Sequence, residues 1–475
     1  MASDGVGAQD RVAFLGKNTP EFFEVMFGAG KLNAVTVPVN WRLAAPEVAY
    51  ILNDAWAKLL VISHEFLPVI ETVKHELTTV NKVIVVEPGG DYEQFATWIA
   101  RPASAALVAP SMPDDVALQL YTSGTTGRPK GAMLTNRNLF AMLPNTSRDW
   151  GFESSSVNLV AMPLFHVGGV GWALVGMFVG AQSVLLREVD PDEVLRVIPR
   201  HLVSHALFVP AVLQTLLATP GVEETDFSSL HYIVYGASPI SVDVLSRSLE
   251  RFGGRFIQGY GLTETTGAVV HLLPDDHDPT GPRVHRLRSA GTPMSGVEVR
   301  IVGANGGEPR RAGEVGEVCV RSAQVMKGYW NRPEETAAVI DSDGWFHTGD
   351  AGYVDADGYL YISDRVKDMI ISGGENIYPA EIENVLMSLP GVSDAAVIGV
   401  PSERWGETPK ALIVRAPGEK PTPEDLIAHC RRHLAGYKAP TSVEFVESIP
   451  RNASGKILKY ELRAPHWRGH ERAVN

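Results

Sequence analysis

Short apolar runs alternate with amphipathic stretches through the first part of this 475-residue chain. Residues 10–15, 34–39 and 58–62 have the apolar, β-branched character of strands. Helix starts lie between these runs at 19–21 and 45–47, where a proline is followed by an acid. Because a strand–helix–strand order favours parallel neighbours, the pattern predicts an α/β domain whose helices cover the faces of its sheets.

The pattern changes after residue 296. Residues 297–302 and 316–321 alternate apolar and polar side chains with a period of two, and glycines separate the two runs. This alternation predicts a small antiparallel barrel attached to the parallel sheets.

The last hundred residues have the character of a smaller α+β domain. Apolar runs at 395–400 and 411–414 precede a capped amphipathic helix that begins near Thr422. A charge-dense segment, 363–368, precedes this part. We therefore expect a large N-terminal domain of stacked, mainly parallel sheets (1–363), a hinge (364–368) and a mobile C-terminal domain (369–475).

Composition excludes several classes of protein. With 45% hydrophobic and 20% charged residues, the chain can build a full core, and its formal net charge of −13 disfavours a nucleic-acid partner. Two well-separated cysteines, Cys319 and Cys430, predict a reducing cytoplasm, and the first residues predict no signal peptide. The uncharged stretch 157–186 contains Pro163 and five glycines, so we expect a buried strand and helix there and no membrane-spanning segment.

The stretch 121–131, YTSGTTGRPKG, is the strongest sign of chemistry. An apolar run precedes it and a helix start at Asn136 follows, so we expect a strand-to-helix turn where backbone amides and the helix dipole bind an anion. The spacing is not that of a Walker loop, but glycines, hydroxyls and a lysine suit a nucleotide triphosphate. The expected phosphate-binding residues are Thr122, Ser123, Gly124, Thr125, Thr126, Gly127 and Lys130.

Two further strings suit the rest of a nucleotide. A strand near residue 233 ends in small residues that let a flat ring approach the backbone, although an ordinary turn is the alternative. In QGYGLTE, Tyr260 can stack on an adenine, and Glu264, with the Thr122 hydroxyl, can hold Mg²⁺. The expected residues are Gly236, Ala237, Ser238, Gln258, Gly259, Tyr260, Gly261, Leu262, Thr263 and Glu264.

These strings, with WFHTGD (345–350) and PRNASGKILK (450–459), resemble the motifs of the adenylate-forming family. That family comprises acyl-CoA synthetases, the adenylation domains of nonribosomal peptide synthetases and beetle luciferases. The resemblance covers nearly the whole chain, although fewer residues precede the first strand than is usual in the family. It implies that His166, in MPLFHVGG, lies beside the acyl carboxylate and that Asp350 binds the ribose hydroxyls.

The resemblance also assigns roles near the hinge and in the C-terminal domain. Asp364 would be the hinge residue, Arg365 would reach the ribose, and Lys456 would be the catalytic lysine. The remaining residues implied to bind nucleotide or the pantetheine arm of CoA are Lys367, Gly373 and Gly374.

The implied activity is that of an ATP-dependent acyl-CoA ligase that uses ATP, Mg²⁺ and CoA. A carboxylic acid would form an acyl-adenylate, and CoA would then take the acyl group. Small residues near the expected adenylate, namely Gly259, Gly261 and Gly267, predict a roomy apolar cavity and hence a medium-chain, long-chain or bulky ring acid. The alternatives are an enzyme that loads a separate carrier protein, a luciferase and a nucleotide-binding pseudoenzyme. The oligomeric state stays open.

Overall fold

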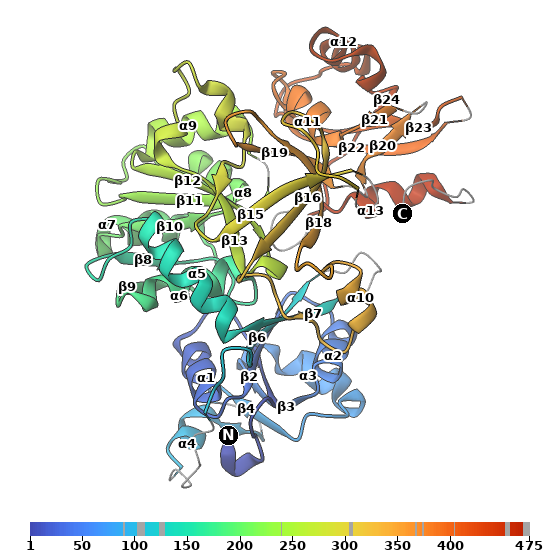
Figure 1. Cartoon of the computed structure of the whole chain (residues 1–475). Helices are drawn as coiled ribbons and strands as arrows, with labels where there is room; N and C mark the ends of the chain where they lie inside the picture. Colours follow the sequence, from blue (N-terminus) through green and yellow to red (C-terminus); the bar gives the residue numbers. More distant parts are fainter. Residues whose placement is uncertain are drawn as a thin grey trace.

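Four β-sheets organise the chain in the computed structural model, which describes residues 1–88, 91–101, 110–122, 129–238, 240–303, 307–365, 368–372, 375–402, 404–451 and 457–468. Figure 1 shows the first part of the chain, in blue, below the green and yellow middle part, with the orange and red C-terminal part at the upper right, beside the green part. The mixed α/β architecture predicted from the sequence is confirmed.

The first sheet has eight strands, and its centre is parallel. Its order is β17 (Gly328–Tyr329), β7 (Lys130–Thr135), β6 (Val116–Thr122), β2 (Val35–Val39), β1 (Arg11–Leu15), β3 (Ala57–Ile62), β4 (Lys82–Val85), β5 (Glu93–Gln94). Every residue of β1 and β2 is buried, as expected for strands covered on both faces. The helices in this part are α1 (Pro20–Lys31), α2 (Ala45–Asp54), α3 (Leu67–Val73) and α4 (Phe95–Ile99).

The prediction for the stretch 121–131 needs a correction. β6 and β7 pair antiparallel, with Thr122 opposite Lys130, so the stretch joins two strands of a hairpin and not a strand to a helix. Helix α5 (Asn136–Asp149) begins only after β7, with the Thr135 hydroxyl capping it by accepting from the Asn138 amide. Strand β7 therefore separates this stretch from α5 along the chain.

The second sheet has seven strands and is parallel from β9 to β12. Its order is β14 (Thr292–Pro293), β13 (Gly267–Leu272), β12 (Arg255–Leu262), β11 (Tyr232–Gly236), β10 (His205–Phe208), β8 (Val157–Val160), β9 (Gln182–Leu185). Its helices are α6 (Val167–Phe178), α7 (Pro191–His201), α8 (Pro210–Ala218) and α9 (Val242–Phe252). The uncharged stretch thus folds as the predicted strand and helix. Among the described residues, no helix has both the length and the apolar character needed to cross a bilayer.

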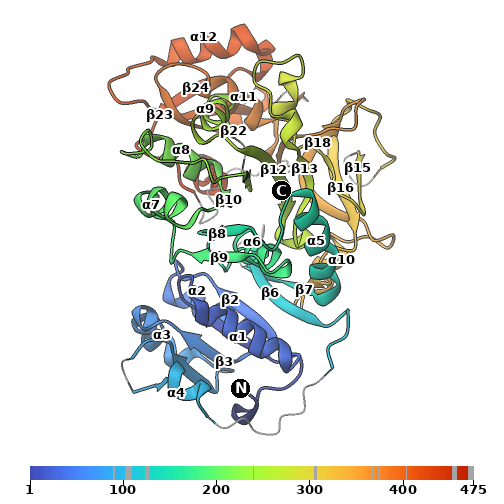
Figure 2. The ribbon, with the colours of Figure 1, turned by 90° about the vertical axis from the view of Figure 1, so that its left-hand side faces the viewer.

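The two large sheets share one core. Phe22 of α1, Leu118 of β6, Trp172 of α6 and Ile257 of β12 belong to a single cluster of buried side chains. Figure 2, turned from the first view, shows α5 and α6 between the two sheets. This shared core fixes the hairpin of the first sheet relative to the strand ends of the second.

The third sheet is antiparallel, as the period-two pattern predicted. Its order is β15 (Val297–Val302), β16 (Gly316–Ser322), β18 (Phe346–Val354), β19 (Leu360–Arg365), and the short helix α10 (Pro333–Ala337) lies between β17 and β18 in sequence. A bridge between Gly291 and Leu360 ties the edge of this sheet to the end of the second.

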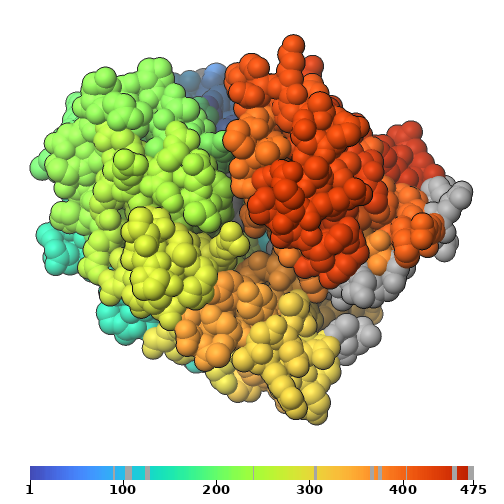
Figure 3. All heavy atoms as spheres, turned by 90° about the horizontal axis from the view of Figure 1, so that it is seen from above, coloured from blue at the N-terminus to red at the C-terminus, as the bar shows by residue number. Residues whose placement is uncertain are grey.

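The C-terminal segments form the fourth sheet with its own core. The strands are β20 (Ile370–Ser372), β21 (Glu375–Ile377), β22 (Val392–Ser402), β23 (Gly406–Arg415) and β24 (Ser442–Phe445), and the helices are α11 (Pro379–Met387), α12 (Pro423–His433) and α13 (Lys459–Arg463). Figure 3 shows this red and orange part beside the green and yellow segments of the second sheet, with a furrow between them.

Candidate active site

The two strings predicted to hold the base come together at one edge of the second sheet. β11 and β12 are parallel neighbours, and the last pair in their register is Gly236 with Gly259. In α/β sheets, ligands bind at the carboxyl ends of parallel strands. Ala237, directly after β11, has a φ of 66°, a left-handed conformation that is uncommon for a residue with a side chain. The edge therefore has the position and the irregular backbone typical of a ligand site.

Tyr260 and Asp350 meet at this edge although ninety positions separate them in sequence. The Tyr260 hydroxyl donates to Asp350 Oδ2 at 2.8 Å, and the Asp350 residue is only 5% exposed. A buried carboxylate is costly unless hydrogen bonds stabilise it. The structure thus places next to each other the residues predicted to contact the adenine and the ribose.

The glycines of this edge serve close backbone packing. A Cβ on Gly236 would lie 2.2 Å from the Gly259 carbonyl oxygen, and one on Gly261 would lie 1.9 Å from the Gly267 carbonyl oxygen. Of the three glycines predicted to open the acyl cavity, Gly261 is therefore the one whose missing side chain makes room for a neighbouring strand. A Cβ on Gly259 would lie 3.3 Å from the Ala268 Cβ and 3.5 Å from the Trp150 ring, whereas among the described residues the atom nearest to a Cβ on Gly267 is Val167 Cγ2, at 4.0 Å.

His166 lies at the N-terminus of α6, directly before Val167. Its Nε2 atom is buried and has no hydrogen-bond partner among the described residues. Burial, with a smaller contribution from the Arg42 charge, lowers the pKa of His166 to about 4, so the imidazole is neutral at neutral pH. A neutral, unpartnered ring nitrogen can donate a hydrogen bond to an incoming carboxylate.

Tyr329 connects the two residues predicted to bind phosphate and metal. Its hydroxyl donates to Glu264 Oε1 at 2.8 Å, and the Lys130 ammonium lies 5.2 Å from the centre of its ring. Lys130 also forms an ion pair with Glu335 of α10, with 2.8 Å between Nζ and Oε2. The predicted phosphate lysine is therefore held by a carboxylate in this structure.

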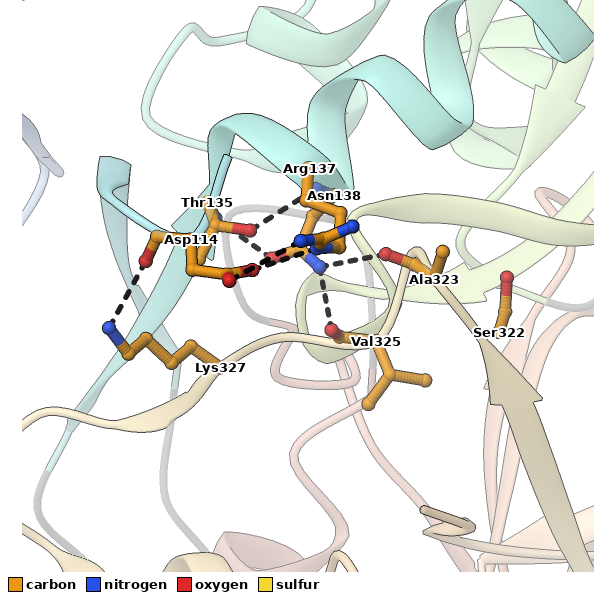
Figure 4. A pocket seen from close by; sticks show the side chains of 8 residues that line it. All are labelled: Asp114, Thr135, Arg137, Asn138, Ser322, Ala323, Val325 and Lys327. Carbon is orange, nitrogen blue, oxygen red and sulfur yellow. Dashed lines mark hydrogen bonds and ion pairs between the residues drawn. The ribbon is translucent and has the colours of Figure 1, made fainter. Parts of the chain in front are cut away.

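Other candidate sites are weaker. A cavity of about 300 Å³ lies between the start of α5 and residues 322–327. Figure 4 shows its lining side chains, among them Asp114, Arg137 and Lys327. Arg137 Nε donates to Asp114 Oδ1 at 2.7 Å, and Lys327 Nζ donates to the Asp114 carbonyl at 3.1 Å. Because its charged groups are already engaged and it contains none of the predicted site residues, we do not assign the activity to it.

Comparison with known proteins identifies the family. Residues 1–330 match the model of the AMP-binding enzyme family, and residues 381–456 match the model of the AMP-binding enzyme C-terminal domain. The chain belongs to the AMP-binding enzyme family. It is thus an adenylate-forming, AMP-forming acid–thiol ligase that uses ATP, as the resemblance implied.

Relatives of this AMP-binding enzyme differ in their named substrates. A fatty acid–[acyl-carrier-protein] ligase of Streptomyces coeruleorubidus is 43% identical over all of this chain and 90% of its own length. A feruloyl-CoA synthase of Amycolatopsis sp is 42% identical over 98% of this chain and 90% of its own length. Among solved structures, ATP-bound MatB from Rhodopseudomonas palustris superposes with a TM-score of 0.88 at 31% identity, over 99% of this chain and 91% of that one.

Several predicted residues of this AMP-binding enzyme stay untested. The backbones of Asp364 and Arg365 belong to β19, where Arg365 pairs with Asp350. Magnesium binding by Thr122 and Glu264, the hinge at Asp364 and the role of Arg365 in ribose binding remain predictions. The residues that lie outside the described part of the chain are Ser123, Gly124, Thr125, Thr126, Gly127, Lys367, Gly373, Gly374 and Lys456.

Sequence reasoning missed Tyr329 and Glu335, which contact the predicted site residues. Neither lies in a string with an evident chemical pattern: Tyr329 is in the two-residue strand β17, and Glu335 is in a single-turn helix. The sequence indicated only that a helix starts near Pro333, and it did not indicate what that helix contacts. Their contacts follow from the pairing of β17 with β7, which begins at Lys130.

Proposed function

We propose that this chain is an acyl-CoA ligase that activates a medium-chain, long-chain or bulky apolar ring carboxylic acid as its acyl-adenylate. The observation that carries the proposal is the Tyr260–Asp350 hydrogen bond at the carboxyl ends of β11 and β12. It provides a stacking ring and a hydroxyl-binding carboxylate, which suit an adenosine. The neutral His166 provides a donor for the second substrate.

In the first step, a carboxylate oxygen attacks the α-phosphorus of ATP and pyrophosphate leaves. His166 would hold the carboxylate through a hydrogen on Nε2, in the neutral tautomer that carries its single ring proton on that atom. Asp350 would accept hydrogen bonds from the ribose hydroxyls and keep the α-phosphorus in line with the attacking oxygen. Fixing two reactants in one geometry is a large part of the rate enhancement for a bimolecular step.

Positive charge must meet the phosphates as pyrophosphate leaves. Lys130 and, from the C-terminal part, Lys456 would supply it. The oxygen atoms of Glu264 and Thr122 are ligands of the kind that Mg²⁺ prefers. When bound there, Mg²⁺ would neutralise charge on the phosphate oxygens.

In the second step, the CoA thiol attacks the acyl carbon, the thioester forms, and AMP leaves with the former carboxylate oxygen. The thiol must reach the carbon that Lys456 approaches in the first step, so we propose that the C-terminal domain rotates about Asp364 between the two steps. The paired glycines Gly373 and Gly374 would then border the pantetheine arm.

The acyl group would lie among the residues around His166. The missing side chain of Gly267, which lies near Val167, and the rings of Trp150 and Trp172, whose centres are 6.1 Å apart, offer apolar surroundings that suit an apolar acyl group better than acetate. The two relatives above are named for a fatty acid and for feruloyl-CoA. Both classes fall within the proposed range.

A carrier protein is the second candidate acceptor. The observation in its favour is the 43% identity with a ligase named for an acyl-carrier-protein acceptor. The test is pyrophosphate release over a panel of fatty and aromatic acids, followed by product analysis with CoA or with a phosphopantetheinylated carrier protein. We expect acid-dependent pyrophosphate release and a CoA thioester. Release that is independent of acid would reject the proposal, and a thioester formed only with the carrier protein would replace the acceptor.

A further inference from the structure

Asp350 lies on an irregularity in its strand. Between β16 and β18, Glu317 is opposite Ala351 and Cys319 is opposite His347, so β18 advances four positions while β16 advances two. β18 therefore carries two extra residues in a bulge just before Ala351. Gly349, within this bulge, has a φ of 67°, which favours glycine. The direction of the Asp350 carboxylate depends on the shape of this bulge.

The Glu317 carboxylate holds the bulge from the neighbouring strand. Its Oε1 accepts a hydrogen bond from the Gly349 amide at 3.1 Å, and its Oε2 lies 2.9 Å from His347 Nδ1. A third contact is made by Thr348, whose hydroxyl donates to the Val318 carbonyl at 2.7 Å and accepts from the Asp350 amide at 3.0 Å. One carboxylate thus joins the residue at the start of the bulge to the amide in its middle.

His347 is supported in turn on its other side. Its Nε2 lies 3.7 Å from Asp341 Oδ2, and the Arg300 guanidinium donates to the same carboxylate oxygen at 3.1 Å. Cys319 is directly opposite His347, and its Sγ lies 3.5 Å from Nδ1. Glu317, Cys319 and His347 are also side chains of the kinds that bind metals. However, both Glu317 oxygens and the His347 Nδ1 already have partners within the protein.

We propose that Glu317 and His347 are positioning residues that fix the bulge and thereby aim Asp350 at the ribose hydroxyls. The inference rests on the proposed function, in which Asp350 binds the ribose. Glu317 acts through Gly349, and His347 acts through Glu317. Removing the Glu317 carboxylate leaves the Gly349 amide without this acceptor, so the bulge and the Asp350 carboxylate can move.

The readout is the preference for ribose hydroxyls, because a merely structural defect would not change it. The quantity to measure is kcat/KM for ATP divided by kcat/KM for 2′,3′-dideoxyATP, from acid-dependent pyrophosphate release. Hydrogen bonds to a charged group contribute enough for the wild-type ratio to be on the order of tenfold or more. Asp350→Ala should reduce the ratio to about one, since it removes the acceptor itself.

The decisive comparison is Glu317→Ala against Glu317→Gln. Alanine should lower the ratio most of the way to the Asp350→Ala value, and the double variant should lower it no further. Glutamine should restore the ratio, because its amide oxygen can accept from Gly349 and its amino group can donate to His347 Nδ1. His347→Leu, which keeps the carboxylate–amide contact, should lower the ratio by a smaller factor and provides an arm that does not depend on how well Glu317→Ala folds.

Cys319→Ala is the matched control within the same cluster. It should keep the wild-type ratio, whereas a metal centre shared by the three side chains would make Cys319→Ala behave like Glu317→Ala and would overturn the inference. If Asp350→Ala gives a ratio near one while Glu317→Ala and His347→Leu both keep the wild-type ratio, the positioning role is rejected but the ribose site is retained. An unchanged ratio in Asp350→Ala would reject the ribose site, and a wild-type protein without acid-dependent pyrophosphate release would reject the proposed function.

Discussion

Replacing His166 by phenylalanine should stabilise the folded protein and weaken the enzyme at the same time. The buried Nε2 has no hydrogen-bond partner among the described residues, and an unsatisfied buried polar atom costs about 1–3 kcal/mol. Phenylalanine has a similar shape and would meet the Phe165 ring, whose centre lies 4.5 Å from that of the imidazole. We expect the free energy of unfolding at pH 7 to rise by about 1 kcal/mol, the low end of that range.

The stability difference should grow as the pH falls. Burial lowers the pKa of His166 from 6.5 to about 4, so between these values the unfolded chain binds a proton that the folded imidazole does not. The wild type therefore loses stability as the pH drops through this window, and the phenylalanine variant lacks this loss. With these pKa values the gap should widen by about 2 kcal/mol between pH 7 and pH 5, which urea unfolding at the two pH values would measure.

The same change should remove a hydrogen bond to the acid substrate. A hydrogen bond to a charged group contributes about 1.5–3 kcal/mol, so kcat/KM for the acid should fall by roughly 10- to 150-fold, with little change in KM for ATP. His205→Phe is the control: burial also lowers the pKa of His205 to about 4, but its ring nitrogens contact the Ser204 hydroxyl and the Gly151 carbonyl. The control should lose stability at pH 7. The reasoning is refuted if His166→Phe also loses stability at pH 7 and keeps its kcat/KM for the acid.

Three further changes test other parts of the site. Glu335→Gln frees Lys130 from a partly exposed ion pair that is worth up to about 1 kcal/mol, so KM for ATP should fall two- to fivefold. The control is Glu334→Gln, at the exposed residue next to Glu335, which should leave KM for ATP unchanged. Gly261→Ala places a methyl group 1.9 Å from a carbonyl oxygen of the facing strand, so thermal melting should show a loss of at least about 1 kcal/mol; an unchanged melting curve would contradict the observed packing. Lys456→Ala should abolish pyrophosphate release but keep thioester formation from a supplied acyl-adenylate, and an equal loss of both steps would refute its assignment to adenylation.

Periodicity and caps were sufficient to predict the strands and helices that bury a regular pattern of side chains. β1, β2 and β3 are short apolar runs, and α1 begins at the predicted Thr19–Pro20 start. The phosphate stretch was misplaced because β7 contains the small residues Gly131 and Ala132, and because the strong cap at Thr135 lies directly behind it. Local propensity does not register a strand whose stability comes from pairing with β6.

The chemical strings predicted which residues meet but not what holds them. Tyr260 and Asp350 were assigned to one nucleotide from separate motifs, and the structure brings them within hydrogen-bond distance. The contacts of Glu264 with Tyr329 and of Lys130 with Glu335 join residues far apart in sequence, so no local pattern encodes them. Gly261 was interpreted as empty space for a substrate, although its missing side chain makes room for a neighbouring strand.

The fate of one oxygen atom tests the whole account most directly. An acid labelled with ¹⁸O in both carboxylate positions should be incubated with the protein, ATP and CoA, and the AMP examined by mass spectrometry. If the carboxylate attacks the α-phosphorus and the thiol then displaces AMP, each AMP formed must carry one ¹⁸O. Unlabelled AMP formed together with the thioester would contradict the adenylate mechanism on which every assigned residue depends.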